Sequence, residues 1–144
     1  MGQFVCEEFR FVLDGFTETS TQIVADVDGP RASIGIAVTR AKLVERELPD
    51  FVDEQIALQK KTFPGLAVLA KTMGHAAGVL SADVRLRTRV RGAMLYHRIA
   101  CFDWFGTVVM FTATAPMRLR DEADARLDAM VESIRFRKPR VETP

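Results

Sequence analysis

Residues 79–115 constrain the fold more than any other part of this chain, because they contain three strand-like runs joined by short turns. The runs cover 79–90, 93–102 and 107–115, and the turns lie at Arg91-Gly92 and around Trp104-Phe105-Gly106. Connections this short leave no room for a crossover, so consecutive strands run antiparallel. The sequence therefore predicts an antiparallel meander at the centre of the fold.

One helix is predicted before this meander in the sequence, and a second helix is predicted after it. The first covers about 49–63, because proline is tolerated in a first turn and Pro64-Gly65 stops the helix. The second covers about 121–134, where apolar residues recur at helical spacing: Leu127, Met130, Val131 and Ile134. Further strands are expected within 4–13 and at 22–27, 32–40 and 66–72.

This order of elements predicts an α+β sandwich. We expect a curved, mostly antiparallel sheet with the two helices packed on one face. The strands at 93–102 and 107–115 are nevertheless apolar on both faces, with Leu95, His97 and Ile99 opposite Met94 and Tyr96. If both helices cover the same face, the spare apolar face meets another subunit or a hydrophobic ligand. The alternative is that these strands are central and that loops cover them.

The first helix has an unusual apolar stripe. At about 100° per residue, Gln55 and Gln59 fall in the middle of the stripe that Phe51, Val52, Ile56, Leu58 and Phe63 form. A buried amide without a partner costs about 1–3 kcal/mol. Either each amide bonds a nearby backbone group or lies at the exposed end of the stripe, or the pair lines a groove that accepts a partner.

The length and composition of the chain fit a single soluble domain. We expect a single domain over 1–138 and a disordered tail at 139–144. No secretory leader is visible at the N-terminus, and no apolar run approaches the ~20 residues that span a bilayer. Cys6 and Cys101 are expected to be buried free thiols. These features predict a soluble cytoplasmic protein without stable membrane association.

Catalytic, metal-binding and nucleic-acid-binding patterns are missing from the sequence. Neither His75 nor His97 has a second ligand at metal-binding spacing, and no nucleophile–base pair or phosphate loop appears. The alternating arginines at 85, 87, 89 and 91 lack the interleaved aromatics of a nucleic-acid platform, and the net charge is only +1. We therefore expect no enzyme activity, no cofactor, no metal and no nucleic-acid partner.

Short motifs in a fixed order resemble a known family. They are Asp14-Gly15-Phe16 after a strand pair, the strand ending at Arg40, the helix start at 48–55, Tyr96-His97-Arg98, the run 110–116 and the closing Ser133-Ile134-Arg135-Phe136-Arg137. In this order and spacing the chain resembles the DcrB-related proteins, which include the Eag-type chaperones of bacterial type VI secretion. The resemblance covers about residues 3–137.

The resemblance implies a fold, a function and a set of contact residues. The fold is a PsbP-like sandwich, and the protein is a cytoplasmic homodimer. Its function is to shield N-terminal transmembrane segments of an effector that carries a PAAR domain and to help load that effector onto the spike. The client-binding residues that it implies are Ile23, Gln55, Gln59, Leu95 and Ile99.

The chain departs from the family pattern beside this set. The family often has glutamines where this chain has His97 and Ile99, so one amide contact is lost and client preference is expected to change. Two other functions stay open: a non-enzymatic carrier of a hydrophobic small molecule or lipid, and a structural subunit of a larger assembly.

Overall fold

The computed structural model describes residues 2–5, 9–13, 16–19, 23–26 and 34–136, with side chains from residue 34 onward. Five strands precede the first helix: β1 (Gly2–Val5), β2 (Phe9–Leu13), β3 (Phe16–Thr19), β4 (Ile23–Asp26) and β5 (Gly35–Lys42). They are followed by α1 (Leu48–Thr62), β6 (Ala67–Ala76), β7 (Val79–Val90), β8 (Ala93–Trp104) and β9 (Thr107–Pro116). The chain continues through η1 (Met117–Leu119), α2 (Arg120–Ser133) and β10 (Arg135–Phe136).

The strands form two sheets. The larger sheet has seven strands in the order β3-β4-β5-β9-β8-β7-β6, and the smaller has the order β1-β2-β10. Every pair within them is antiparallel. The meander predicted for 79–115 is confirmed as β7, β8 and β9, which are neighbours in the larger sheet. The predicted α+β sandwich is confirmed with it.

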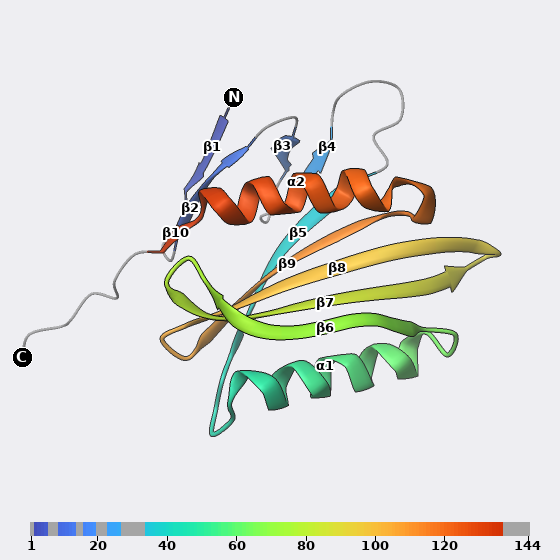
Figure 1. The fold of residues 1–144 in the computed structure, drawn as a ribbon, viewed down its shortest axis with the longest axis horizontal. Coiled ribbons are helices and arrows are strands. Elements are labelled where there is room, and N and C mark those ends of the chain that lie inside the picture. Colours follow the sequence, from blue (N-terminus) through green and yellow to red (C-terminus); the bar gives the residue numbers. More distant parts are fainter. Residues whose placement is uncertain (1, 6–8, 14–15, 20–22, 27–33, 137–144) are drawn as a thin grey trace, which may run out of the picture.

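The prediction that both helices cover the same face is wrong. Successive side chains of a strand point to opposite faces. On β8, Ala100 and Phe102 pack with Leu127 of α2, whereas Cys101 packs with Phe51 of α1. The two helices therefore lie on opposite faces, and Figure 1 shows strands β6–β9 between them. Strands apolar on both faces reflect two helix layers, one on each side.

The α2 face holds the larger core. Ala123, Leu127 and Met130 of α2, together with Ile134 directly after the helix, pack against β5, β8 and β9. The largest fully buried side chains of these strands are Ile36, Tyr96, Phe102 and Phe111. Phe102 and Phe111 meet edge to face with ring centroids 5.8 Å apart. Burying an aromatic or large aliphatic side chain contributes about 1.5–3 kcal/mol, so this layer supplies much of the stability.

A buried arginine ties α2 to the sheet. Arg98 of β8 bonds the Asp83 carboxylate of β7 at 2.6 Å and the Asp128 carboxylate of α2 at 2.7 Å. Tyr96 donates its hydroxyl to Asp124 of α2 at 2.6 Å. Burial disfavours the charge of Arg98, but its carboxylate partners raise its pKa above the usual range. The cation stays charged and gives α2 a fixed orientation.

The alternating arginines of β7 have different surroundings. Arg85 bonds Asp124 at 3.3 Å and so belongs to the network under α2, whereas Arg89 is exposed. Two other expectations lie outside the described residues: the state of Cys6 and the tail at 139–144. The domain boundary at 138 stays a prediction.

Candidate functional site

An open cleft runs along one side of α1, and we call it the α1 cleft. Its volume is about 220 Å³. Its walls come from α1 and from the strands β5, β7, β8 and β9, with these lining residues: Thr39, Val52, Gln55, Ile56, Gln59, Val84, Leu86, Ile99, Cys101, Met110 and Thr112. Apolar side chains dominate the set, and the polar exceptions are two threonines, two glutamines and the buried thiol.

The cleft exists because α1 covers only part of its face of the sheet. Leu48, Phe51 and Val52 are buried against β7 and neighbouring strands. On the side of β6, Asp53 forms an ion pair with Lys71, which fixes the helix near that edge. The other side of α1 is left facing β9 and β5, where Met110 and Thr112 stay half-buried instead of being fully covered.

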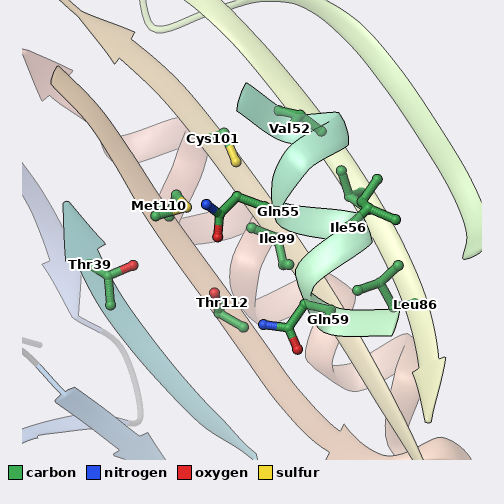
Figure 2. A pocket seen from close by; sticks show the side chains of 11 residues that line it. Thr39, Val52, Gln55, Ile56, Gln59, Leu86, Ile99, Cys101, Met110 and Thr112 are labelled. Atoms are coloured by element: carbon green, nitrogen blue, oxygen red, sulfur yellow. The ribbon is translucent and has the colours of Figure 1, made fainter. Parts of the chain in front are cut away.

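Both glutamine amides lie in this opening. Gln55 is half-buried and Gln59 is exposed, and Figure 2 shows their side chains leaving α1 on the side of Met110, Ile99 and Thr112. Neither amide has a hydrogen-bond partner within residues 34–136. The interpretation in which each amide bonds a nearby backbone group is therefore not supported there. The amides remain available to a bound molecule.

A second cavity continues the α1 cleft toward the C-terminal end of α1, and we call it the His97 pocket. It has a volume of about 110 Å³ and is lined by Gln59, Leu66, Leu86, Thr88, His97, Ile99 and Thr112. Gln59, Leu86, Ile99 and Thr112 line both cavities. The two therefore form one elongated groove over the sheet, with Ile99 in the wall that they share.

His97 is held in place by the strands on either side of β8. Its Nε2 atom lies 2.8 Å from the Thr88 hydroxyl of β7, and its Nδ1 atom lies 3.2 Å from the Thr114 hydroxyl of β9. Burial lowers the pKa of His97, since the charged imidazolium loses solvation. With both ring nitrogens engaged, His97 links the two neighbouring strands, and its ring lines the His97 pocket.

This environment predicts a pH-dependent stability. Because the folded-state pKa of His97 lies below its unfolded value of about 6.5, the unfolded chain takes up the proton first as the pH falls. The free energy of unfolding is therefore expected to decrease below about pH 6.5 and to level off below the folded-state pKa. Urea titrations at several pH values measure this slope. The His97→Gln variant should lose that component, and an unchanged slope in the variant would contradict the assignment to His97.

The structure brings together three of the five client-binding residues expected from the sequence. Gln55, Gln59 and Ile99 line the α1 cleft. Leu95 shares their face of β8 but lies farther along, half-buried, opposite Pro116. Ile23 lies on β4 and pairs with Ala37 of β5, and its side chain is outside what the structure describes.

Sequence reasoning missed the floor of the cleft. Met110 and Thr112 of β9 and Thr39 of β5 line it, and Thr112 lies directly opposite Ile99. The tight turn around 104–106 carried the necessary signal, because a hairpin turn sets the register of the strands that it joins. Counting back from that turn places Thr112 beside Ile99.

Cys101 is the one thiol that lines the α1 cleft. Burial, with the nearby Asp83 charge, raises the pKa of Cys101 to about 12, so the thiol stays protonated at neutral pH and is a poor nucleophile. No group of three or more His, Cys, Asp or Glu gathers as metal ligands in the described part of the chain. Neither described helix combines the length and the apolar character that crossing a bilayer requires.

Solved structures with the same fold come from several bacteria. CyanoP, the PsbP protein of Synechocystis sp. PCC 6803, has a TM-score of 0.71 at 10% identity, over 94% of this chain and 91% of its own. PA94 of Pseudomonas aeruginosa, described as a putative regulator, has a TM-score of 0.66 at 18% identity, over 92% and 90%. The expected PsbP-like fold is thereby confirmed. Identities this low show the fold alone.

A third similar structure covers only part of its chain. TplEi, an immunity protein of the type VI secretion system of Pseudomonas aeruginosa solved with a peptide, has a TM-score of 0.56 at 14% identity. The match covers 81% of this chain and 48% of TplEi. No curated protein matches the sequence. The DcrB family model, in contrast, matches residues 11–133, and the chain belongs to the DcrB family.

Proposed function

We propose that this protein is a cytoplasmic, non-enzymatic chaperone that holds apolar helices of a type VI secretion effector until export. The client is an effector with a PAAR domain and N-terminal transmembrane segments, which the chaperone helps to load onto the spike. The protein works as a dimer and has no stable association with the membrane. One observation carries the proposal: the α1 cleft offers two amides that have no hydrogen-bond partner among the described residues, beside partly exposed apolar side chains.

The physical chemistry of the cleft suits an apolar helix. Such a helix needs apolar contact along one side, which Ile56, Ile99 and Met110 offer. Transmembrane helices also carry small polar groups that hydrogen-bond across helix interfaces. Gln55 and Gln59 lie one helical turn apart and supply both donors and acceptors to such groups.

Membership of the DcrB family and the fold of TplEi also support the chaperone proposal. The resemblance to the Eag-type chaperones lies within the DcrB-related proteins, and the family match covers most of the chain. TplEi has this fold, belongs to a type VI secretion system and was solved with a bound peptide. A fold does not determine function, so the proposal depends on the geometry of the cleft.

A carrier of a hydrophobic small molecule is the second candidate. The enclosed part of the α1 cleft favours it, because Cys101, Val84 and Leu86 form a buried apolar end. Its volume of about 220 Å³ lies below the roughly 300–1,000 Å³ of typical small-molecule sites. An elongated open groove fits one side of a helix better than a lipid chain.

Detergent-free affinity purification from the native cells tests the proposal. The tagged protein is expected to recover a large protein with apolar segments near its N-terminus, identified by mass spectrometry. Gln55→Lys and Leu95→Lys should each reduce that recovery at least tenfold, because an apolar helix would bury an unpaired charge. Their melting temperatures should stay close to that of the wild type, since both positions are partly exposed.

A matched control separates the site from general surface effects. Val44 is 69% exposed in the segment before α1, so Val44→Lys should recover the client normally. Recovery of no protein partner from cells that make secretion components, together with an extractable small molecule, would instead establish the carrier.

A further inference from the structure

Strand β6 forms one edge of the seven-stranded sheet and is exposed along most of its length. It pairs with β7, and its outer edge has no strand partner among the residues that the structure describes. Every residue of Val68–His75 is exposed, including three large apolar side chains at about 40%: Val68, Leu69 and Met73. A long edge strand of this kind presents a row of free backbone donors and acceptors.

The usual protection of an edge strand is weak in β6. Charged side chains and bulges keep most edges from pairing with other chains. The only charged residue of β6 is Lys71, and its charge is compensated by the ion pair with Asp53. The single irregularity lies between Val68 and Ala70, near the start of the strand. Seven regular residues, 70–76, remain open before the turn at Ala77-Gly78.

The sequence of this regular run is symmetric in size about its midpoint. It reads Ala-Lys-Thr-Met-Gly-His-Ala, with Met73 in the middle. Antiparallel pairing of two such strands about Met73 places Ala70 opposite Ala76, Lys71 opposite His75 and Thr72 opposite Gly74. Small residues then share one face of the ladder, and the long side chains share the other. Like charges are kept apart, because each Lys71 meets a histidine.

Other registers of self-pairing are worse. A two-fold axis at Lys71 sets two ammonium groups directly opposite each other, which destabilises a ladder. An axis at Gly74 places Lys71 opposite Ala77. Ala77 has a φ of 53° in the turn and cannot continue a strand. Only a two-fold axis at Met73 pairs all the residues of the regular run, 70–76.

We infer that a second copy of this chain docks on β6, antiparallel about a two-fold axis at Met73. The seven-stranded sheets of the two copies join into one, and the α1 clefts of both copies face the same side, since the axis is perpendicular to the sheet. The inference rests on the dimer of the proposed function and assigns an interface to that dimer. Its test uses no client, so failure of either idea is seen separately.

Cysteine cross-linking tests the register directly. Directly opposite residues of an antiparallel pair have Cα atoms ~4.5–5.5 Å apart, within the range that a disulfide spans. Met73→Cys in a Cys6→Ser background should therefore give a covalent dimer when diamide oxidises the two thiols. His75→Cys is the matched control on the same face of β6, because its two copies lie about 13 Å apart in this register. The control should stay monomeric on a non-reducing gel.

The association state tests the interface without cross-linking. Light scattering on the purified wild type should give the mass of a dimer at micromolar concentration, and Met73→Glu should shift it to the monomer by placing two carboxylates at the axis. Val44→Glu, on an exposed segment away from β6, should leave the dimer intact. A wild-type monomer, a dimer unaffected by Met73→Glu, or equal cross-linking of the two cysteine variants would each overturn the inference.

Discussion

Replacing Arg98 by methionine is expected to lower the free energy of unfolding by about 3 kcal/mol, the low end of the range for breaking a buried ion pair. The Arg98 side chain is 7% exposed and bonds Asp83 and Asp128 at 2.6 and 2.7 Å. Methionine fills much of the same space, so the loss comes from leaving the facing carboxylates without their cation. Partial exposure of Asp83 and Asp128 keeps the effect below the upper end.

Urea unfolding measures this loss, and two further variants identify its cause. Arg98→Lys keeps the charge but loses the planar fork that reaches two carboxylates, so we expect an intermediate loss. Arg87→Met is the control, because Arg87 has no ion pair among the described residues, and its effect should be within about 0.5 kcal/mol. An equal loss for Arg98→Met and Arg87→Met would show that the carboxylate network adds nothing to stability.

Local turn chemistry made the meander predictable. Arg91-Gly92 and Phe105-Gly106 have positive φ at both residues, as tight hairpin turns require, and glycine takes the second position at little cost. The same geometry recurs at Ala77-Gly78. The strand expected at 66–72 therefore continues to Ala76, because only Ala77-Gly78 closes the hairpin.

The placement of the helices was beyond local reasoning. An apolar stripe shows which side of α1 is buried, but it carries no information on which face of the sheet receives it. Because β8 is apolar on both faces, with Phe102 on one and Cys101 on the other, either arrangement satisfied its pattern. The helix faces are decided by connections between strands that are distant in sequence, and no short-range signal reports them.

The candidate site was predictable only on the helix and one strand. Gln55 and Gln59 stood out because polar residues interrupt an apolar stripe, and the structure places both in the α1 cleft. The contribution of β5 depends on its pairing with β9, since Thr39 lies opposite Met110. That pairing joins residues about seventy positions apart, and the sequence alone offered no register for it.

Replacing Ile99 by lysine is expected to have the largest effect on binding, because Ile99 lines both cavities of the groove. An ammonium group there would be buried under any apolar helix that the cleft accepts, without a carboxylate among the lining residues to pair with it. We expect the affinity for a 20-residue apolar helical peptide to fall at least a hundredfold, about 2.7 kcal/mol. Fluorescence titration in detergent-free buffer measures it.

The free protein should tolerate this change, since lysine extends its chain along apolar surface and keeps its charge in water while the groove is empty. Met94→Lys is the control on the opposite face of β8: Met94 is half-buried like Ile99 but lies outside both cavities. The control should bind the peptide as the wild type does. If Ile99→Lys keeps its melting temperature and still binds the peptide normally, the groove beside α1 is not where an apolar helix docks.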